Sequence, residues 1–364
     1  MSKAEQIPTE EARQIQHIVE LTIRQLQMRY PDKRVLRGVH TKDHGCVEAR
    51  FEIEPEIDAD LRVGVFQQPC RCYRALVRFS NADTLVRPDS TPGANGGPPA
   101  HGSRGMAIKL LDAPGPFLET GAEPSQDFLM INQPVFAFAN VEDYEVLSRV
   151  VVDHKDDIRP FFAERLPPPG TDTPSPSQLR ARKTGEIAAR IRSNSATDVN
   201  VPAFQPPPAS PVDNSYFGAS SFQFGPDRVM RFRAVPAAPS SDVPDVSDPN
   251  YLRTGLARRL RDQKQGPVVF HFEVRVRNVD SLNPAVDIEN ASMDWTDSST
   301  FRRVATLTIP LQEFDTPELR ERCEQLVFTP WHGLVDHRPL GGINRLRRAV
   351  YEASARFRNL PKFA

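Results

Sequence analysis

The chain has 364 residues, and its 46 basic side chains nearly cancel its 47 acidic ones. A net charge of -1 gives no overall field that would attract nucleic acid or an anionic membrane, so neither is expected as a partner. The length allows a large buried core without a disulfide framework. No apolar run approaches the ~18 residues of a membrane span, and no targeting segment is evident. With only four cysteines, we expect a cytoplasmic protein.

The first predicted element is an amphipathic helix over 10–29, where apolar residues recur at helical spacing. Two strands are predicted next, at 46–53 and 73–80, because apolar and polar residues alternate there. On the second strand, Arg78 and Ser80 share one face. The pair Cys70-x-Cys72 at its start lacks the spacing of a zinc site and is interpreted as two small side chains.

Further strands and helices alternate irregularly along the chain. Strands are predicted at 105–111, 228–233, 268–277 and 302–309, and helices at 141–153, 178–193, 251–264 and 344–359. Proline clusters between 167 and 211 and between 236 and 249 predict loops; the first of these either closes over the site or is disordered. This pattern favours an α+β fold with an antiparallel barrel surrounded by helices.

The last predicted helix carries the first candidate site. Arg347 and Tyr351 are one turn apart on one face, and Arg358 follows seven residues later on that face. A close guanidinium stabilises a phenolate, which is a suitable proximal ligand for ferric haem iron. Without a ligand, the same pattern describes a basic amphipathic helix with a partly buried tyrosine.

A histidine near the N-terminus supplies the second candidate site. His40 follows Arg37 by three residues and precedes the first strand. A histidine there could take a proton from a peroxide and return it, with Ser80 as an orienting partner. His44 is an equally visible competitor, and a solvated loop histidine is the plainer interpretation.

The order of these motifs resembles the catalase family from Arg37 to Arg358. The matching segments are RGVH at 37–40, VRFS at 77–80, SRGMAIK at 103–109, DFLMINQPVF at 127–136, and RRAVY at 347–351 with Arg358 beyond it. The resemblance implies haem b as cofactor, Tyr351 as iron ligand and Arg347 as the residue that keeps it ionised. His40 would be the distal acid–base, with Ser80 behind it, and Asn132 would help to bind peroxide. Other haem contacts are implied for Arg37, Val39, Arg78, Phe136, Tyr144 and Arg358.

Three departures from the family pattern are visible. An ungapped match puts Ile131 rather than Asn132 at the distal asparagine position, whereas a one-residue shift restores Asn132. Ala355 stands where the family has a histidine, and we expect the long C-terminal helical region of typical catalases to be missing. The expected division is an N-terminal helical arm at 1–30, usable in a homodimer or in intramolecular packing, and a catalase-like haem domain at 31–364.

The resemblance implies a haem enzyme that cleaves the O–O bond of a hydroperoxide. The favoured reaction is a peroxidase that uses hydrogen peroxide or an organic hydroperoxide with a small organic reductant, because missing family segments should widen the channel. True catalase, a fatty-acid hydroperoxide isomerase of the allene oxide synthase kind and a non-enzymatic haem protein are the alternatives.

Overall fold

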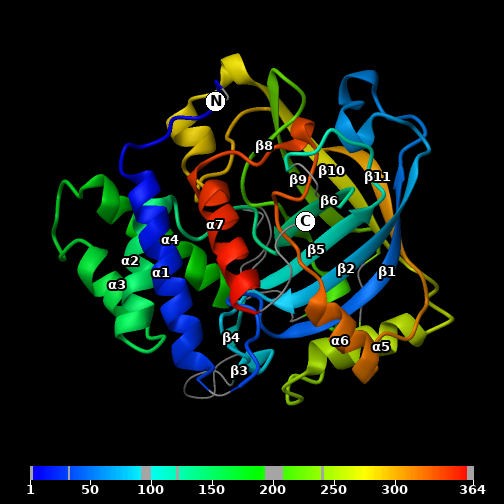
Figure 1. Cartoon of the computed structure of the whole chain (residues 1–364), viewed down its shortest axis with the longest axis horizontal. Helices are drawn as coiled ribbons and strands as arrows, with labels where there is room; N and C mark the ends of the chain where they lie inside the picture. Colours follow the sequence, from blue (N-terminus) through cyan, green and yellow to red (C-terminus); the bar gives the residue numbers. More distant parts are fainter. Residues whose placement is uncertain are drawn as a thin grey trace.

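In the computed structural model, eight antiparallel strands close into a barrel (Figure 1). The structure describes residues 3–31, 33–91, 100–119, 123–192, 208–238 and 242–358. The order is β10-β11-β1-β2-β5-β6-β7-β9, and pairing of β9 with β10 completes the ring. The barrel strands are β1 (Asp43–Ile53), β2 (Cys72–Asn81), β5 (Arg104–Leu111), β6 (Ser125–Ile131), β7 (Tyr216–Phe217), β9 (Arg228–Pro236), β10 (Val268–Asn278) and β11 (Arg302–Ile309). β8 (Phe222–Gln223) pairs antiparallel with β9, and β3 (Ser90–Thr91) pairs with β4 (Ala100–His101). The predicted α+β barrel is confirmed.

The barrel interior is filled by aromatic rings from several strands. Phe272 on β10 lies with its ring centroid 4.8 Å from that of Phe128 on β6 and 5.1 Å from that of Phe51 on β1. Phe66 and Phe232 complete this cluster, and all five rings are almost fully buried. Each contributes about 1.5–3 kcal/mol through burial. Since alternate residues of a strand face opposite sides, the polar residues between them face outward, toward the helices.

Helices gather on one side of the barrel. In Figure 1, α1 (Glu11–Arg29) to α4 lie together at the left, and α7 (Gly342–Phe357) runs between them and the strands. The other helices of this group are α2 (Val141–Asp153), α3 (Arg159–Arg165) and α4 (Pro176–Arg192); α5 (Tyr251–Arg261) and α6 (Pro317–Gln325) lie beside β1. Ile18 of α1 packs with Val141 of α2 and Leu346 of α7. The apolar stripe of the N-terminal helix is therefore used within the chain.

Among the described strands and α-helices, β6, α3 and α6 were not predicted, and neither were the two-residue strands β3, β4, β7 and β8. β6 lies in a segment where every residue from Ser125 to Met130 is buried, so apolar and polar residues do not alternate there. The helices α3 and α6, of 7 and 9 residues, are too short for a clear period, although Thr316 caps α6 and Pro317 follows it, which is a helix-start signal. The predicted helix at 344–359 begins two residues earlier than expected.

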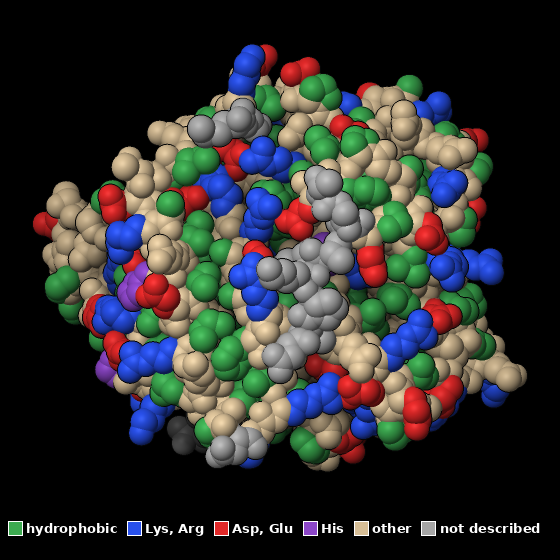
Figure 2. Space-filling view, viewed as in Figure 1, with side chains coloured by type: hydrophobic (Ala, Val, Ile, Leu, Met, Phe, Trp, Pro, Cys, Tyr) green, Lys and Arg blue, Asp and Glu red, His purple; other side chains and the backbone are tan. Residues whose placement is uncertain are grey.

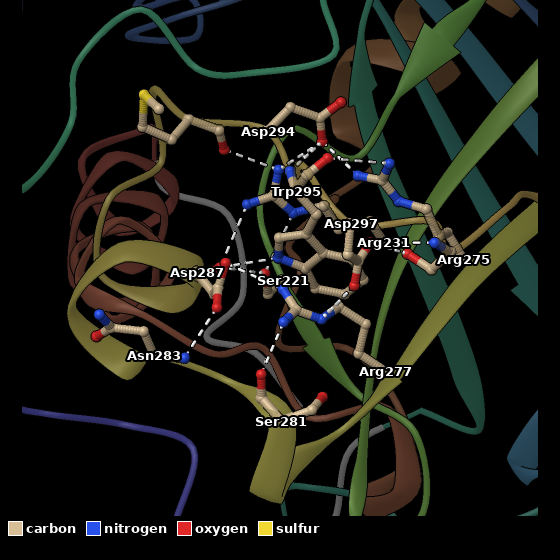
Figure 3. A network of polar contacts seen from close by, with 12 residues as sticks. Ser221, Arg231, Arg275, Arg277, Ser281, Asn283, Asp287, Asp294, Trp295 and Asp297 are labelled. Atoms are coloured by element: carbon tan, nitrogen blue, oxygen red, sulfur yellow. Dashed lines mark hydrogen bonds and ion pairs between the residues drawn. The ribbon is translucent and has the colours of Figure 1, made fainter.

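A polar network fixes the connection between β10 and β11 to the outer face of the barrel (Figure 3). Asp294 accepts hydrogen bonds from Arg231 on β9 and Arg275 on β10. Both guanidinium groups lie over the ring of Trp295, at 5.0 and 5.2 Å from its centroid, and the indole NH donates to the Asp287 carbonyl at 3.1 Å. In the same connection, the Ala291 carbonyl accepts a hydrogen bond from the backbone NH of Phe136. The network thereby holds a loop that borders the candidate site.

Buried charges anchor the start of α7. The Arg345 guanidinium contacts the carboxylates of Glu5, Glu11 and Glu289, at 2.8 Å for Glu289. Glu5 and Glu289 also accept the backbone NH groups of Gly341 and Gly342, which open the helix. Carboxylates at this end are favoured because the first NH groups of a helix lack intrahelical partners. Residues distant in the sequence thus fix the helix that carries Tyr351.

Charges of both signs are mixed on the face of the molecule shown in Figure 2. Among the helices that the structure describes, none combines the length and the apolar character needed to cross a lipid bilayer.

We expect Arg345→Gln to destabilise the protein by about 3 kcal/mol, because it leaves three largely buried carboxylates without their cation. Urea unfolding at neutral pH measures this. The matched control is Arg356→Gln on the same helix, whose exposed pair with Glu352 should contribute less than about 0.5 kcal/mol. Equal stability of the two variants would contradict the anchoring role.

Candidate functional site

A cavity of about 240 Å³ lies between the outer face of the barrel and the helices α1, α2 and α7. The predicted site residues line it, with the single exception of Asn132. They are Arg37, Val39, His40, Arg78, Ser80, Phe136, Tyr144, Arg347, Tyr351 and Arg358. Arg78 and Ser80 reach it because both lie on the outward face of β2, and the spacing of Arg347, Tyr351 and Arg358 turns them to one side of α7.

His40 is held by a hydrogen bond and by the space that a glycine leaves for its ring. Its Nδ1 lies 3.0 Å from the hydroxyl oxygen of Ser80, as the sequence predicts. The backbone of His40 has a φ of 58°, a conformation that non-glycine residues seldom adopt and that is found at functional sites. A Cβ at Gly105 would lie 2.4 Å from Nδ1, so only glycine leaves room for the ring.

The competing histidine is occupied elsewhere. His44 lies on β1, is fully buried, and its Nε2 is 2.9 Å from the Oδ1 of Asn81. It does not line the cavity. Of the two histidines, only His40 is placed to meet a ligand there.

The environment keeps the His40 ring neutral. Burial, together with the guanidinium groups of Arg78, Arg347 and Arg37, lowers the pKa of His40 to about 3. A neutral imidazole can accept a proton at neutral pH. Because Nδ1 is engaged with Ser80, Nε2 is the ring nitrogen left for that purpose.

Three arginines converge at one end of the cavity. Arg37 donates to a carboxylate oxygen of Glu324 at 2.6 Å, and Arg78 lies 3.6 Å from the other. Arg358 donates to the Glu324 carbonyl at 3.3 Å. Arg78 also donates to the His40 carbonyl at 2.9 Å, which ties this end to the histidine. The Glu324 carboxylate therefore pairs with two of these cations, and its backbone carbonyl accepts from the third.

This cationic end is incompletely satisfied. The Nε atoms of Arg78 and Arg358 are buried and have no hydrogen-bond partner among the described residues. Burial and the neighbouring Arg78 lower the pKa of Arg37 to about 10, and burial and Arg37 lower the pKa of Arg358 to about 9. Buried groups of like charge with free donors are suited to bind carboxylates or similar anions.

The opposite side of the cavity presents a phenol next to a cation. Arg347 donates to the hydroxyl oxygen of Tyr351 at 3.2 Å, and its Cζ lies 5.3 Å from the ring centroid. Arg347 also donates to the Oδ1 of Asn344 at 3.2 Å. Asn344 is fully buried, and its amide nitrogen donates to the carbonyls of Ser221 and Leu340. The positive charge beside the phenol is therefore held in place through Asn344 by the segment before β8 and by Leu340, just ahead of α7.

Aromatic and aliphatic groups form the remaining walls. The rings of Phe136 and Tyr144 stack with centroids 6.1 Å apart, and burial raises the pKa of Tyr144 to about 12. Leu21 of α1 and Leu147 and Val151 of α2 extend the apolar wall. Among the described parts of the proline-rich region 167–211, no residue lines the cavity; positions 193–207 lie outside the described residues.

The structure corrects the assignment of Asn132. Its Oδ1 accepts the backbone NH of Arg104 at 2.7 Å and the hydroxyl of Ser103 at 3.1 Å, and its side chain does not line the cavity. Ile131, the preceding residue, lines it instead. The ungapped match with the catalase pattern, which puts Ile131 at this position, therefore agrees with the structure. A shift of one residue along a strand moves a side chain to the opposite face.

Three further residues shape the site without having been predicted. Glu324 neutralises the arginines, Asn344 positions Arg347, and Gly105 makes room for His40. Glu324 lies on α6, which was not predicted, and no pattern in the sequence pairs it with the arginines. Asn344 was counted only as the start of a helix, and Gly105 only as a strand residue.

The residues present fit a haem group. The partnerless Nε atoms of Arg78 and Arg358 suit two propionates, and the phenol of Tyr351 beside a guanidinium is a hard anionic donor suited to ferric iron. The wall between these two ends is mainly aliphatic and aromatic, as a porphyrin ring requires.

Comparison with known proteins supports the fold. No protein-family model matches the chain, and neither does any curated protein sequence. Similar solved structures include a fungal catalase, a bacterial catalase and catalase A from Saccharomyces cerevisiae, with TM-scores of 0.60, 0.57 and 0.60 and sequence identities of 14%, 13% and 13%. Each alignment covers 92% of this chain but only 61%, 59% and 62% of the catalase. The chain thus has a catalase-like fold and spans about three fifths of the length of these catalases.

We expect Glu324→Gln to destabilise the protein by about 3 kcal/mol, because the buried guanidinium groups of Arg37 and Arg78 lose their shared counter-charge. Urea unfolding measures the change. Glu321→Gln, one turn earlier on α6, removes only an exposed pair with Arg34 and should cost less than about 1 kcal/mol. If both variants unfold alike, Glu324 is not the residue that holds the cationic end together.

Proposed function

We propose that this chain is a haem-dependent enzyme that handles hydroperoxides, and that its reaction is a peroxidase reaction with a small organic reductant. The observation that carries the proposal is the meeting of two pairs in one cavity: Tyr351 with Arg347, and His40 with Ser80. The catalase-like fold supports it at the level of architecture.

The haem would be held at both ends by residues of this chain. Tyr351 would ligate the iron, with Arg347 stabilising the phenolate, and Arg37, Arg78 and Arg358 would bind the propionates. Haem bound in this way supplies redox chemistry at ferric iron for cleavage of the O–O bond.

His40 would move the proton. A hydroperoxide in the cavity loses its proton to Nε2 of the neutral ring, and the same nitrogen returns it to the leaving oxygen. Ser80 and Gly105 keep the ring in one orientation during both transfers. A non-enzymatic haem carrier would have no need of this arrangement.

The apolar wall favours organic molecules as oxidant or reductant. Ile131 offers no hydrogen bond at the position where a polar residue would orient hydrogen peroxide, and Leu21, Leu147 and Val151 provide an aliphatic surface. This distribution supports a peroxidase over a dismutase of hydrogen peroxide. Assays with hydrogen peroxide alone, with an organic reductant and with a fatty-acid hydroperoxide separate peroxidase, catalase and isomerase activity.

When expressed with ample haem, the parent protein should bind haem and show a ferric tyrosinate-type absorption spectrum. The Tyr351→Phe variant should show a shifted or absent Soret band. Haem extraction quantifies occupancy in both. Tyr144→Phe is the control, because it removes a phenol from the same cavity without touching the proposed ligand. A haem-free parent protein, or an unchanged spectrum in the Tyr351 variant, would refute the proposal.

For the distal side, we expect His40→Gln to lower peroxide turnover by at least about 100-fold while haem content is unchanged. Gly105→Ala should act similarly, on the order of 100-fold, by displacing the His40 ring. Gly102→Ala is the control, since its Cβ would lie 3.7 Å from the nearest atom. Full turnover in Gly105→Ala would argue against His40 as the distal group.

Turnover in the parent protein should be level from about pH 5 to about pH 8 and fall toward pH 3, where the His40 ring becomes protonated.

A further inference from the structure

Two of the four cysteines meet at a junction behind the arginines of the cavity. Cys46 on β1 lies opposite Arg78 of β2 in the sheet register. Arg78 reaches Glu324, and Cys323 directly precedes Glu324 on α6, which packs on β1. The thiols of Cys46 and Cys323 lie close enough for each to shift the pKa of the other. Both are reduced in this structure.

The two thiols differ in their surroundings. Cys323 is 2% exposed, whereas Cys46 is partly exposed. The neighbouring Cys46 thiol, together with Arg78 and Arg37, lowers the pKa of Cys323, while the neighbouring Cys323 thiol and burial raise the pKa of Cys46. Asp43 and Glu324 are the carboxylates that also face this cluster. A thiol whose pKa is lowered by nearby cations, with a second thiol beside it, is the arrangement of an oxidisable pair.

We infer that Cys46 and Cys323 form a redox site that a hydroperoxide oxidises to a disulfide linking β1 to α6. The Cys323 thiolate attacks one peroxide oxygen and the O–O bond breaks; the other oxygen leaves and takes a proton, as water or an alcohol. Cys46 then attacks the resulting sulfenic sulfur, the S–S bond forms and water leaves. Two thiols are oxidised by two electrons and one peroxide is reduced. The choice of oxidant rests on the proposed function, whereas the pairing of the thiols does not.

The bond would fix the cationic end of the cavity. The carbonyl of Cys323 accepts a hydrogen bond from Arg37 at 3.2 Å, and the next residue, Glu324, holds Arg37 and Arg78. A covalent link between β1 and α6 therefore restrains the residues proposed to bind the haem propionates. It also joins segments near the two ends of the sequence, which constrains the unfolded chain strongly.

The test uses the full-length chain with Cys70→Ser and Cys72→Ser, because these exposed thiols would compete for oxidant. The reduced protein is treated with a slight excess of hydrogen peroxide, alkylated and analysed by intact-mass and peptide mass spectrometry. We expect the loss of two hydrogen atoms, two fewer alkylated thiols and a Cys46–Cys323 peptide that dithiothreitol releases. The linked form should melt several degrees above the reduced form.

Single variants test the order of the steps. Cys46→Ser should accumulate a sulfenic acid at Cys323 that dimedone traps, whereas Cys323→Ser should leave Cys46 alkylatable. Haem content and peroxide turnover are measured on the same samples. If the disulfide forms in protein that contains no haem and turns over no peroxide, this inference stands and the proposed function is refuted. Alkylation of both thiols after peroxide treatment, or over-oxidation of Cys323 without a link, would overturn the inference.

Discussion

A closed barrel filled with phenylalanine rings leaves each strand only one face on which polar groups can act. The rings of Phe51, Phe128 and Phe272 lie at the centre of the apolar cluster that fills the inner face. Charged residues of the strands must therefore point outward, and on β2 this puts Arg78 and Ser80 on the side covered by helices. The cavity exists because the helices lie over these outward-facing polar groups without filling the space between.

The position of α7 depends on charges rather than on apolar packing alone. Arg345 ties its start to three carboxylates, and Asn344 joins it to Ser221 on the segment leading into β8. Through Asn344 the same helix end controls where the Arg347 guanidinium meets Tyr351. Phenol and histidine come from opposite ends of the chain, and buried polar contacts fix both. Such contacts favour one arrangement of the helix, since a shift would leave charges unpaired.

Sequence patterns predicted most of the framework because the relevant forces are local. Alternation identified β1, β2 and β10, and helical spacing correctly grouped Arg347, Tyr351 and Arg358. The choice between His40 and His44 required the barrel, since only the fold determines which histidine lines the cavity. Glu324 could not be predicted because its role arises from a helix of 9 residues brought against Arg37 from a distance of 287 residues along the chain.

The cavity has walls of two different kinds. On one side are barrel strands, each hydrogen-bonded to two neighbours; on the other are α1 and α2, which contribute Leu21, Leu147 and Val151 and are held mainly by side-chain packing. Segments held by fewer long-range hydrogen bonds open at lower free energy than the centre of a sheet. Molecules should therefore enter and leave by fluctuations of the helical layer, and changes on α1 can alter exchange rates while the melting of the barrel stays the same.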